Sequence, residues 1–126
     1  STSNKINNNT DIYIVDTYGE SKAFYKICKT VFLGGSLINH GGQNPVEPVR
    51  FGCKILHGPN VQNFTEVYKL LKKNNLSFQL KNIDQLVYLI DKSFINKTNF
   101  TNKLDKLKKM GSKILSKTLI EINNYL

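Results

Sequence analysis

The chain has 126 residues, of which 40% are hydrophobic and 21% charged, and 18 basic residues against 9 acidic ones give it a formal net charge of +9. A length this close to the usual domain size predicts a single domain and excludes a complete two-domain enzyme. Two cysteines are too few for a disulfide framework, so free thiols are expected. No apolar run reaches the roughly 18 residues that a membrane span requires.

The positive charge is concentrated at the end of the chain, where eight lysines and three acidic residues lie between Asp91 and Leu126. Such a basic end fits a polyanionic partner, either nucleic acid or an anionic membrane surface, and it also fits an ordinary solvated helix face. Binding to single-stranded nucleic acid needs aromatic side chains that stack on bases. Residues 96–126 offer only Phe100 and Tyr125, so nucleic acid is the less favoured partner.

Four short apolar runs are typical of strands buried on both faces of a parallel sheet. They are Ile12–Val15, Val31–Leu33, Ile55–Leu56 and, more weakly, Ser77–Leu80. Other apolar residues follow the i, i+3, i+4, i+7 spacing of helices. These are Phe24, Ile27 and Cys28, then Phe64, Val67, Tyr68 and Leu71, then Ile83, Leu86, Val87, Ile90 and Phe94. The alternation predicts an α/β fold, a mostly parallel sheet of about four strands with helices on both faces.

Capping signals and composition divide the chain into three parts. Capping boxes, in which an Asn is followed three positions on by Glu or Gln, are predicted at three helix starts. The pairs are Asn44 with Glu47, Asn63 with Glu66 and Asn82 with Gln85. We expect residues 1–10 to be a disordered leader or a cut end, residues 11–95 to be the α/β core, and residues 96–126 to be a basic amphipathic C-terminal helix.

One segment carries the strongest signal for chemistry: Leu33–Pro48, which reads LGGSLINHGGQNPVEP. It follows a predicted strand and opens a predicted helix, and ligands of open α/β sheets bind at that edge. Glycines let the backbone approach a phosphate, and a helix N-terminus offers free N–H groups to an anion. Glu47, one turn into the helix, is placed to accept hydrogen bonds from the two hydroxyls of a ribose. Alternatively, the glycines form only a long surface turn, and Glu47 only completes its capping box.

A second polar cluster, Asp16–Glu20, follows the first apolar run. It fits either the N-terminal cap of a helix or a second wall of the same cleft, because the carboxyl ends of parallel strands share one edge. His40 and His57 have no partner at metal-ligand spacing, so no metal site is expected. Ser36 has no Ser-His-Asp context, so we assign it no role as a nucleophile.

These segments resemble, in order and spacing, the C-terminal donor-binding part of the 3-deoxy-D-manno-octulosonic acid (Kdo) transferases of lipopolysaccharide synthesis. The matching segments are Asp16–Glu20, Phe32–Leu37, His40–Pro48, and Gly58–Pro59 followed by Asn63–Phe64. The resemblance implies an inverting GT-B glycosyltransferase with Rossmann-like domains. It implies transfer of Kdo from CMP-Kdo to a lipid A precursor at the cytoplasmic face of the bacterial inner membrane, without a metal or other cofactor.

The same resemblance implies a set of donor-binding residues. These are Gly34, Gly35, Ser36, Gly41, Gly42, Asn44 and Glu47, with Gly19 and Glu20 nearby. No counterpart of the family's first domain, which carries its general base, is found in this sequence. We therefore assign no catalytic residue, and expect the chain not to be a competent catalyst alone, because transfer needs donor and acceptor held in one geometry.

Three kinds of partner follow from this interpretation. The first is the CMP-Kdo donor, and the second is an N-terminal acceptor domain or partner chain that covers an open sheet edge at Ile12–Val15. The third is the anionic membrane surface or the lipid A precursor. Two other functions stay open: a non-catalytic remnant that only pairs with a partner chain, and a basic nucleic-acid-binding module.

Overall fold

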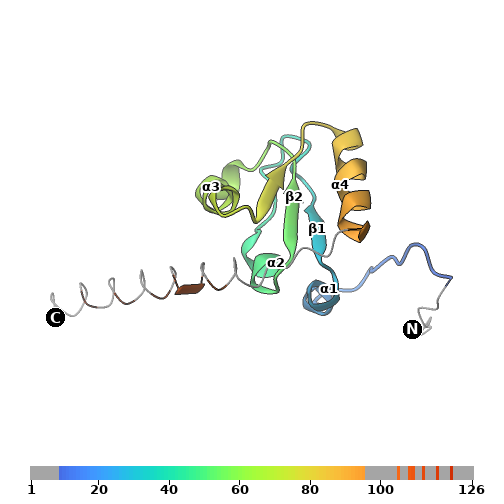
Figure 1. The fold of residues 1–126 in the computed structure, drawn as a ribbon, viewed down its shortest axis with the longest axis horizontal. Helices are drawn as coiled ribbons and strands as arrows, with labels where there is room; N and C mark the ends of the chain where they lie inside the picture. Colours follow the sequence, from blue (N-terminus) through green and yellow to red (C-terminus); the bar gives the residue numbers. More distant parts are fainter. Residues whose placement is uncertain are drawn as a thin grey trace.

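The computed structural model describes residues 9–95 and, beyond them, Asp105, Lys108, Lys109, Ser112, Ser116 and Ile120. The elements, in chain order (Figure 1), are α1 (Ser21–Ile27), β1 (Thr30–Leu33), α2 (Val46–Arg50), β2 (Lys54–His57), the 3₁₀ turn η1 (Gln62–Phe64), α3 (Thr65–Lys73), β3 (Ser77–Gln79) and α4 (Ile83–Ile95). Strands alternate with helices, so the predicted α/β class is confirmed. Most of the expected leader and most of the expected C-terminal helix lie outside the described residues.

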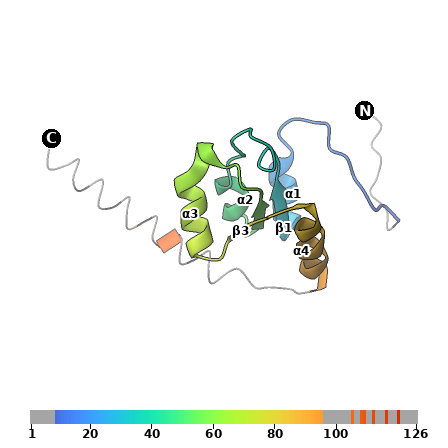
Figure 2. The same cartoon turned by 90° about the horizontal axis from the view of Figure 1, so that it is seen from above.

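The three strands form a parallel sheet in the order β1-β2-β3. Thr30 lies opposite Lys54 at the start of the first pair, and Leu33 lies opposite His57 at its end. Parallel neighbours need crossover connections, and α2 and α3 provide them. Figure 2 shows α1 and α2 on one side of the sheet and α4 on the other. None of the described helices has the length and apolar content to cross a bilayer.

The core lies between the sheet and the helices α2 and α3, because alternate residues of each strand point to that face. Its buried residues are Leu33, Val49, Cys53, Ile55, Tyr68, Leu71 and Leu76. On the central strand β2, both Ile55 and the adjacent Leu56 are completely buried, so both faces of the sheet are covered there. Burying such a side chain stabilises the fold by about 1.5–3 kcal/mol.

The predicted strand at Ile12–Val15 is wrong, and the sheet has three strands instead of about four. The segment lies outside every helix and strand, and Ile12 and Ile14 are 81% and 82% exposed. Its aromatic contact is between Tyr13 and Phe24 of α1, with ring centroids 6.1 Å apart. A strand is stabilised by its ladder and its packing, and the apolar run by itself supplies neither.

For two helices, the apolar residues predicted to be buried are buried only in part. Helix α1 buries no residue completely, and Tyr25 packs against the core while Ile27 is exposed. In α4, Ile83 and Val87 are more than half exposed. Both helices lie at the margin of a small sheet, which buries only part of the apolar face of each helix.

One of the three capping boxes forms in part: Asn82 caps the helix, but the Gln85 side chain reaches back to the N–H of Lys81 and not to that of Asn82. Gln85 N–H donates to Asn82 Oδ1 at 3.0 Å, while Gln85 Oε1 accepts from Lys81 N–H at 2.8 Å. The box predicted at Asn63 is wrong, because Asn63 lies inside η1 and α3 begins only at Thr65. The box predicted at Asn44 is wrong: its Oδ1 accepts from Val46 N–H at 2.9 Å, two residues on, and the residue that precedes α2 is Pro45, which has no side-chain cap.

The buried imidazole of His57 makes the stability of the fold depend on pH. Its Nδ1 lies 2.7 Å from the Gly58 carbonyl oxygen, to which it donates, and its ring packs against that of Tyr68 at a centroid distance of 4.3 Å and a tilt of 49°. Burial lowers the pKa of His57; the hydrogen bond to Gly58 opposes this shift, and the charge of Lys72 adds to it. The unfolded chain therefore binds a proton more readily than the folded chain does below about pH 6.5.

We predict that the melting temperature falls as the pH is lowered from 7.5 to 5.5. The variant His57→Gln should flatten this dependence, because the group that charges only on unfolding is gone. The exposed His40 is the matched control, and His40→Gln should keep the slope of the wild-type chain. Equal slopes in wild-type and His57→Gln, measured by thermal unfolding at matched ionic strength, would contradict this account.

Candidate functional site

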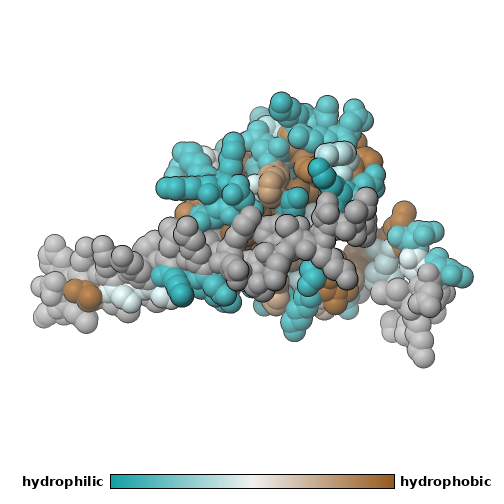
Figure 3. All heavy atoms as spheres, viewed as in Figure 1, coloured by the Kyte–Doolittle hydropathy of each residue, from teal (hydrophilic) through white to brown (hydrophobic). Residues whose placement is uncertain are grey.

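Two loops leave the sheet at the carboxyl ends of adjacent parallel strands. The glycine loop, residues 34–44, follows β1, and the second loop, residues 58–61, follows β2. In an open parallel sheet, this edge is where ligands bind. Figure 3 shows hydrophilic side chains over much of the top of the molecule, where these loops lie in the view of Figure 1.

Ser36 joins the two loops from inside the protein. Its hydroxyl donates to the Leu33 carbonyl oxygen at 2.6 Å and accepts from Gly58 N–H at 2.8 Å. Its own carbonyl oxygen accepts from the backbone N–H of Asn60 at 2.9 Å and from Asn60 Nδ2 at 3.2 Å. We call this set of contacts the Ser36 junction. Ser36 is 0% exposed, so its hydroxyl has no surface with which to meet a ligand in this structure.

The glycines of the loops are required by geometry at several positions. A Cβ at residue 58 would overlap the carbonyl oxygen of Ser36, so only glycine allows the junction. Gly35, Gly41 and Gly42 have φ values of +67°, +91° and +73°, which side chains of L-residues disfavour. Gly42 N–H donates to the Gly35 carbonyl at 3.1 Å and closes the glycine loop on itself.

Tyr68 ties the far end of the glycine loop to the core. Its hydroxyl donates to the Gln43 carbonyl oxygen at 3.0 Å, while its ring packs on His57 in the core. Burial raises the pKa of Tyr68 to about 12, so the group is a neutral hydrogen-bond donor at any ordinary pH. The helical spacing of the sequence placed Tyr68 in the core correctly. A buried tyrosine hydroxyl needs a hydrogen-bond partner, and this requirement is the sequence signal for its second role, the contact with Gln43.

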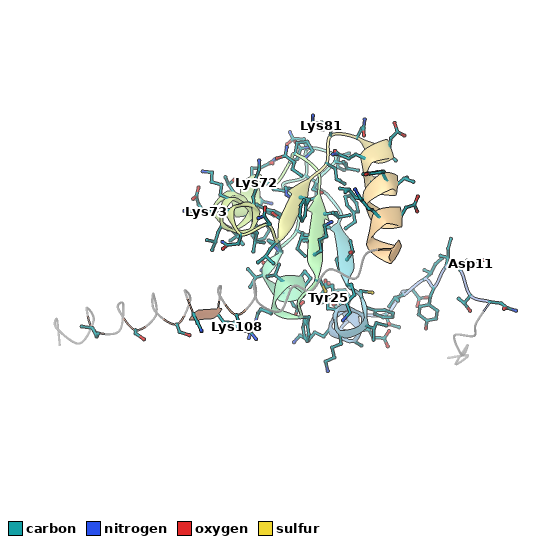
Figure 4. The ribbon with its side chains drawn as sticks, viewed as in Figure 1. Asp11, Tyr25, Lys72, Lys73, Lys81 and Lys108 are labelled. Atoms are coloured by element: carbon teal, nitrogen blue, oxygen red, sulfur yellow. The ribbon has the colours of Figure 1, made fainter. Side chains whose placement is uncertain are left out.

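Glu47 faces α1 and does not complete its capping box. Its Oε1 lies 3.8 Å from Nζ of Lys22, and its side chain is 44% exposed. The Tyr25 hydroxyl lies near this carboxylate, between α1 and α2 (Figure 4). Burial and, to a lesser extent, the charge of Glu47 raise the pKa of Tyr25. Glu47 is therefore accessible from solvent, beside one exposed lysine.

The predicted anion site at a helix N-terminus is weakened by the length of the helix. Helix α2 has five residues, Val46–Arg50, and so few aligned peptide units supply little dipole. Negative charge at this edge therefore has to be met by loop N–H groups and by lysines. Lys81, which follows β3, is labelled at the top of Figure 4, on the side where the strands end, whereas Lys72 and Lys73 lie near the end of α3, which leads to the start of β3.

The second polar cluster leads into α1. Glu20 precedes the helix, accepts a hydrogen bond from the Thr17 hydroxyl at 2.6 Å, and receives Ala23 N–H on its carbonyl at 2.9 Å. Gly19 has a φ of +89° and is exposed. These contacts are those of a helix start, and through Lys22 the first turn of α1 reaches Glu47.

The predicted donor-binding residues divide into two groups by exposure. Ser36, Gly41 and Gly42 are buried and shape the loop from below. The others have some exposed surface: Gly34, Gly35, Asn44, Glu47, Gly19 and Glu20. Within the described part of the chain, no three His, Cys, Asp or Glu side chains gather as a metal-ligand set.

The sequence relatives and the solved structure that match the chain agree with each other. No protein-family model matches the chain. A 3-deoxy-D-manno-octulosonic acid transferase of Haemophilus influenzae is 39% identical over 71 residues, which cover 56% of this chain and 17% of that protein. The transferase of Rickettsia prowazekii is 33% identical over 125 residues, 94% of this chain and 27% of that protein. The chain thus spans about a quarter or less of the length of these relatives.

Among solved structures, the C-terminal CMP-Kdo binding domain of WaaA from Acinetobacter baumannii matches with a TM-score of 0.69 at 24% sequence identity. The match covers 79% of this chain and 52% of that domain. At this identity the likeness concerns the fold: the three-stranded sheet and its helices match about half of that α/β domain.

We predict that Gly58→Ala lowers the free energy of unfolding by about 1–3 kcal/mol, because its methyl group meets backbone that cannot move without opening the Ser36 junction. Gly34→Ala is the matched control: its Cβ meets nothing within 4 Å, and its φ is not in the positive region. Urea unfolding of both variants measures the difference. Similar and small losses in the two variants would show that the loops are not held together at Gly58.

Proposed function

We propose that the chain, which is 33% identical to a 3-deoxy-D-manno-octulosonic acid transferase over 94% of its length, is the part of such an enzyme that binds the donor, CMP-Kdo. The observation that carries the proposal is the glycine loop, fixed at the carboxyl edge of β1 by the Ser36 junction and by Tyr68. Such a loop presents backbone to a ligand without side chains in the way. A relative's domain of the same fold is described as CMP-Kdo binding, which supports the same assignment.

The exposed residues of the site suit the chemistry of this ligand. The backbone of Gly34 and Gly35 is accessible to a phosphate, and the half-exposed carboxylate of Glu47 is available for the ribose hydroxyls. CMP-Kdo is an anion, and the net charge of +9 favours its approach. No described residue is assigned as the base of the transfer reaction. We therefore propose that the chain binds the donor and does not complete the transfer alone.

The acceptor side of the reaction requires partners. The related solved domain is about twice the length that the chain matches, and the curated relatives are longer still. Strand β1 is at one edge of the described sheet, and the exposed Ile12–Val15 segment precedes it. We propose that this edge is covered by the remaining part of the transferase, and that the lipid A precursor at the inner membrane is the acceptor.

The proposal is tested by titrating the 126-residue chain with CMP and following its amides by NMR. We predict that the largest shifts fall in the glycine loop, at Gly34, Gly35, Ser36, Gly41 and Gly42, because the bound phosphate changes the environment of these N–H groups. Shifts confined to the lysines of residues 96–126 would indicate charge attraction alone and would refute the proposal.

We predict that Glu47→Gln weakens CMP binding at least about tenfold, since a hydrogen bond to a charged group contributes about 1.5–3 kcal/mol. The melting temperature should hardly change, because the ion pair with Lys22 is exposed and contributes little. Glu66→Gln is the control: Glu66 also lies in the first turn of a helix and pairs with a lysine, Lys69. Calorimetric titration and thermal unfolding of both variants give the two quantities. Unchanged affinity in Glu47→Gln would reject the ribose role.

A further inference from the structure

Resting on the proposed function, we propose that Ser36 is a positioning residue for the donor site: it sets the glycine loop against the second loop and does not itself contact the ligand. The residue type alone fits a phosphate ligand equally well. Its contacts decide otherwise, because the hydroxyl both donates, to Leu33, and accepts, from Gly58, and no part of the residue is exposed.

The Ser36 junction connects the end of β1 to the beginning of the loop that follows β2. Leu33 is the last residue of β1, and its carbonyl oxygen is held by the Ser36 hydroxyl. Gly58 follows β2 directly, and its N–H is held by the same hydroxyl. Strands β1 and β2 are paired from Thr30 opposite Lys54 to Leu33 opposite His57. The Ser36 junction continues this pairing, because it holds the two loops together directly after the strands end.

Asn60 holds the other side of Ser36. Two donors of Asn60, its backbone N–H and its side-chain amide, converge on the Ser36 carbonyl oxygen. The Asn60 carbonyl oxygen in turn lies close under Gly42, where a Cβ would come within 3.0 Å of it. Both ends of the glycine loop are thereby set by residues of the second loop, so a shift at Asn60 is transmitted to Gly35 and Gly42, which bond to each other at 3.1 Å.

The geometry tolerates little change. The approach of the loops requires glycine at residue 58, and Ser36 and Gly58 are both buried. Removing the Ser36 hydroxyl leaves the Gly58 N–H without its acceptor in a buried position, and the loops then separate or admit water. In metal sites, groups that orient the ligating side chains from behind typically change affinity roughly 10- to 100-fold when removed, although they do not touch the metal. We expect an effect of about the lower end of that range here.

The experiment compares CMP affinity with thermal stability in the full 126-residue chain. Ser36→Ala and Asn60→Ala are each expected to weaken CMP binding roughly tenfold, and the double variant is expected to lose less than the product of the two, because both act through one junction. Asn60→Ala is also expected to shift the amides of Gly34 and Gly35, which lie in the other loop. Asn60 is only half-buried, so this variant carries the test if Ser36→Ala does not fold.

Matched controls separate positioning from a loss of stability. Ser77 is a second buried serine, on β3, and its hydroxyl has no hydrogen-bond partner among the described residues, so Ser77→Ala should keep CMP affinity. Asn74 also donates its amide to a backbone carbonyl, that of Leu70 at 2.8 Å, and Asn74→Ala should keep affinity as well. Leu76→Val, a change in the core, should lower the melting temperature with no change in affinity.

The outcomes distinguish this inference from the proposed function. If the wild-type chain binds CMP and both junction variants bind it equally well, Ser36 is a structural residue only and the inference is overturned. The same holds if every destabilised variant, Leu76→Val included, loses affinity in proportion to its melting temperature. If the wild-type chain does not bind CMP at all, the proposed function fails and the inference fails with it.

Discussion

The contact on which the site depends is the approach of Gly58 to Ser36. Parallel strands end at the same edge of a sheet, and the loops that leave them carry backbone groups that need hydrogen-bond partners. The Ser36 hydroxyl satisfies two of these groups at once, the Leu33 carbonyl and the Gly58 N–H. Two loops that would otherwise be separate surface turns are thus one platform, and its shape is set by hydrogen bonds inside the protein.

Tyr68 gives this platform a second attachment, and it comes from the core. The ring lies against His57 and the hydroxyl holds Gln43, so one side chain contributes to packing and to loop geometry together. Because burial keeps the Tyr68 hydroxyl protonated, this attachment does not vary with pH in the ordinary range. The imidazole beside it does charge on unfolding at low pH. Acid therefore destabilises the fold through His57, while the Tyr68 hydroxyl remains a protonated donor.

The sequence predicts the strands of the sheet because continuous apolar runs are short and well separated, and three of four such runs are β1, β2 and β3. The fourth, Ile12–Val15, fails because an apolar run indicates a need for burial and says nothing of what covers it. For the site, the pattern locates the glycine loop but cannot divide its residues into those that face solvent and those that face inward. A serine hydroxyl can bind a ligand at the surface or satisfy backbone groups inside the protein. For Ser36, only the position of Gly58, 22 residues along the chain, decides between these two roles.

The shortness of helices α1 and α2 limits how the charge of an anionic donor can be balanced. Helix α2 has five residues and α1 has seven, so neither supplies the dipole of a long helix. If the chain binds CMP-Kdo as proposed, loop N–H groups and exposed side chains such as Lys22 have to meet that charge, and Lys22 is already within 3.8 Å of Glu47. A lysine that already pairs with a carboxylate is a modest counter-charge for a nucleotide sugar. Under the same proposal, further positive groups would come from the remaining part of such a transferase, since the chain matches 52% of the related domain.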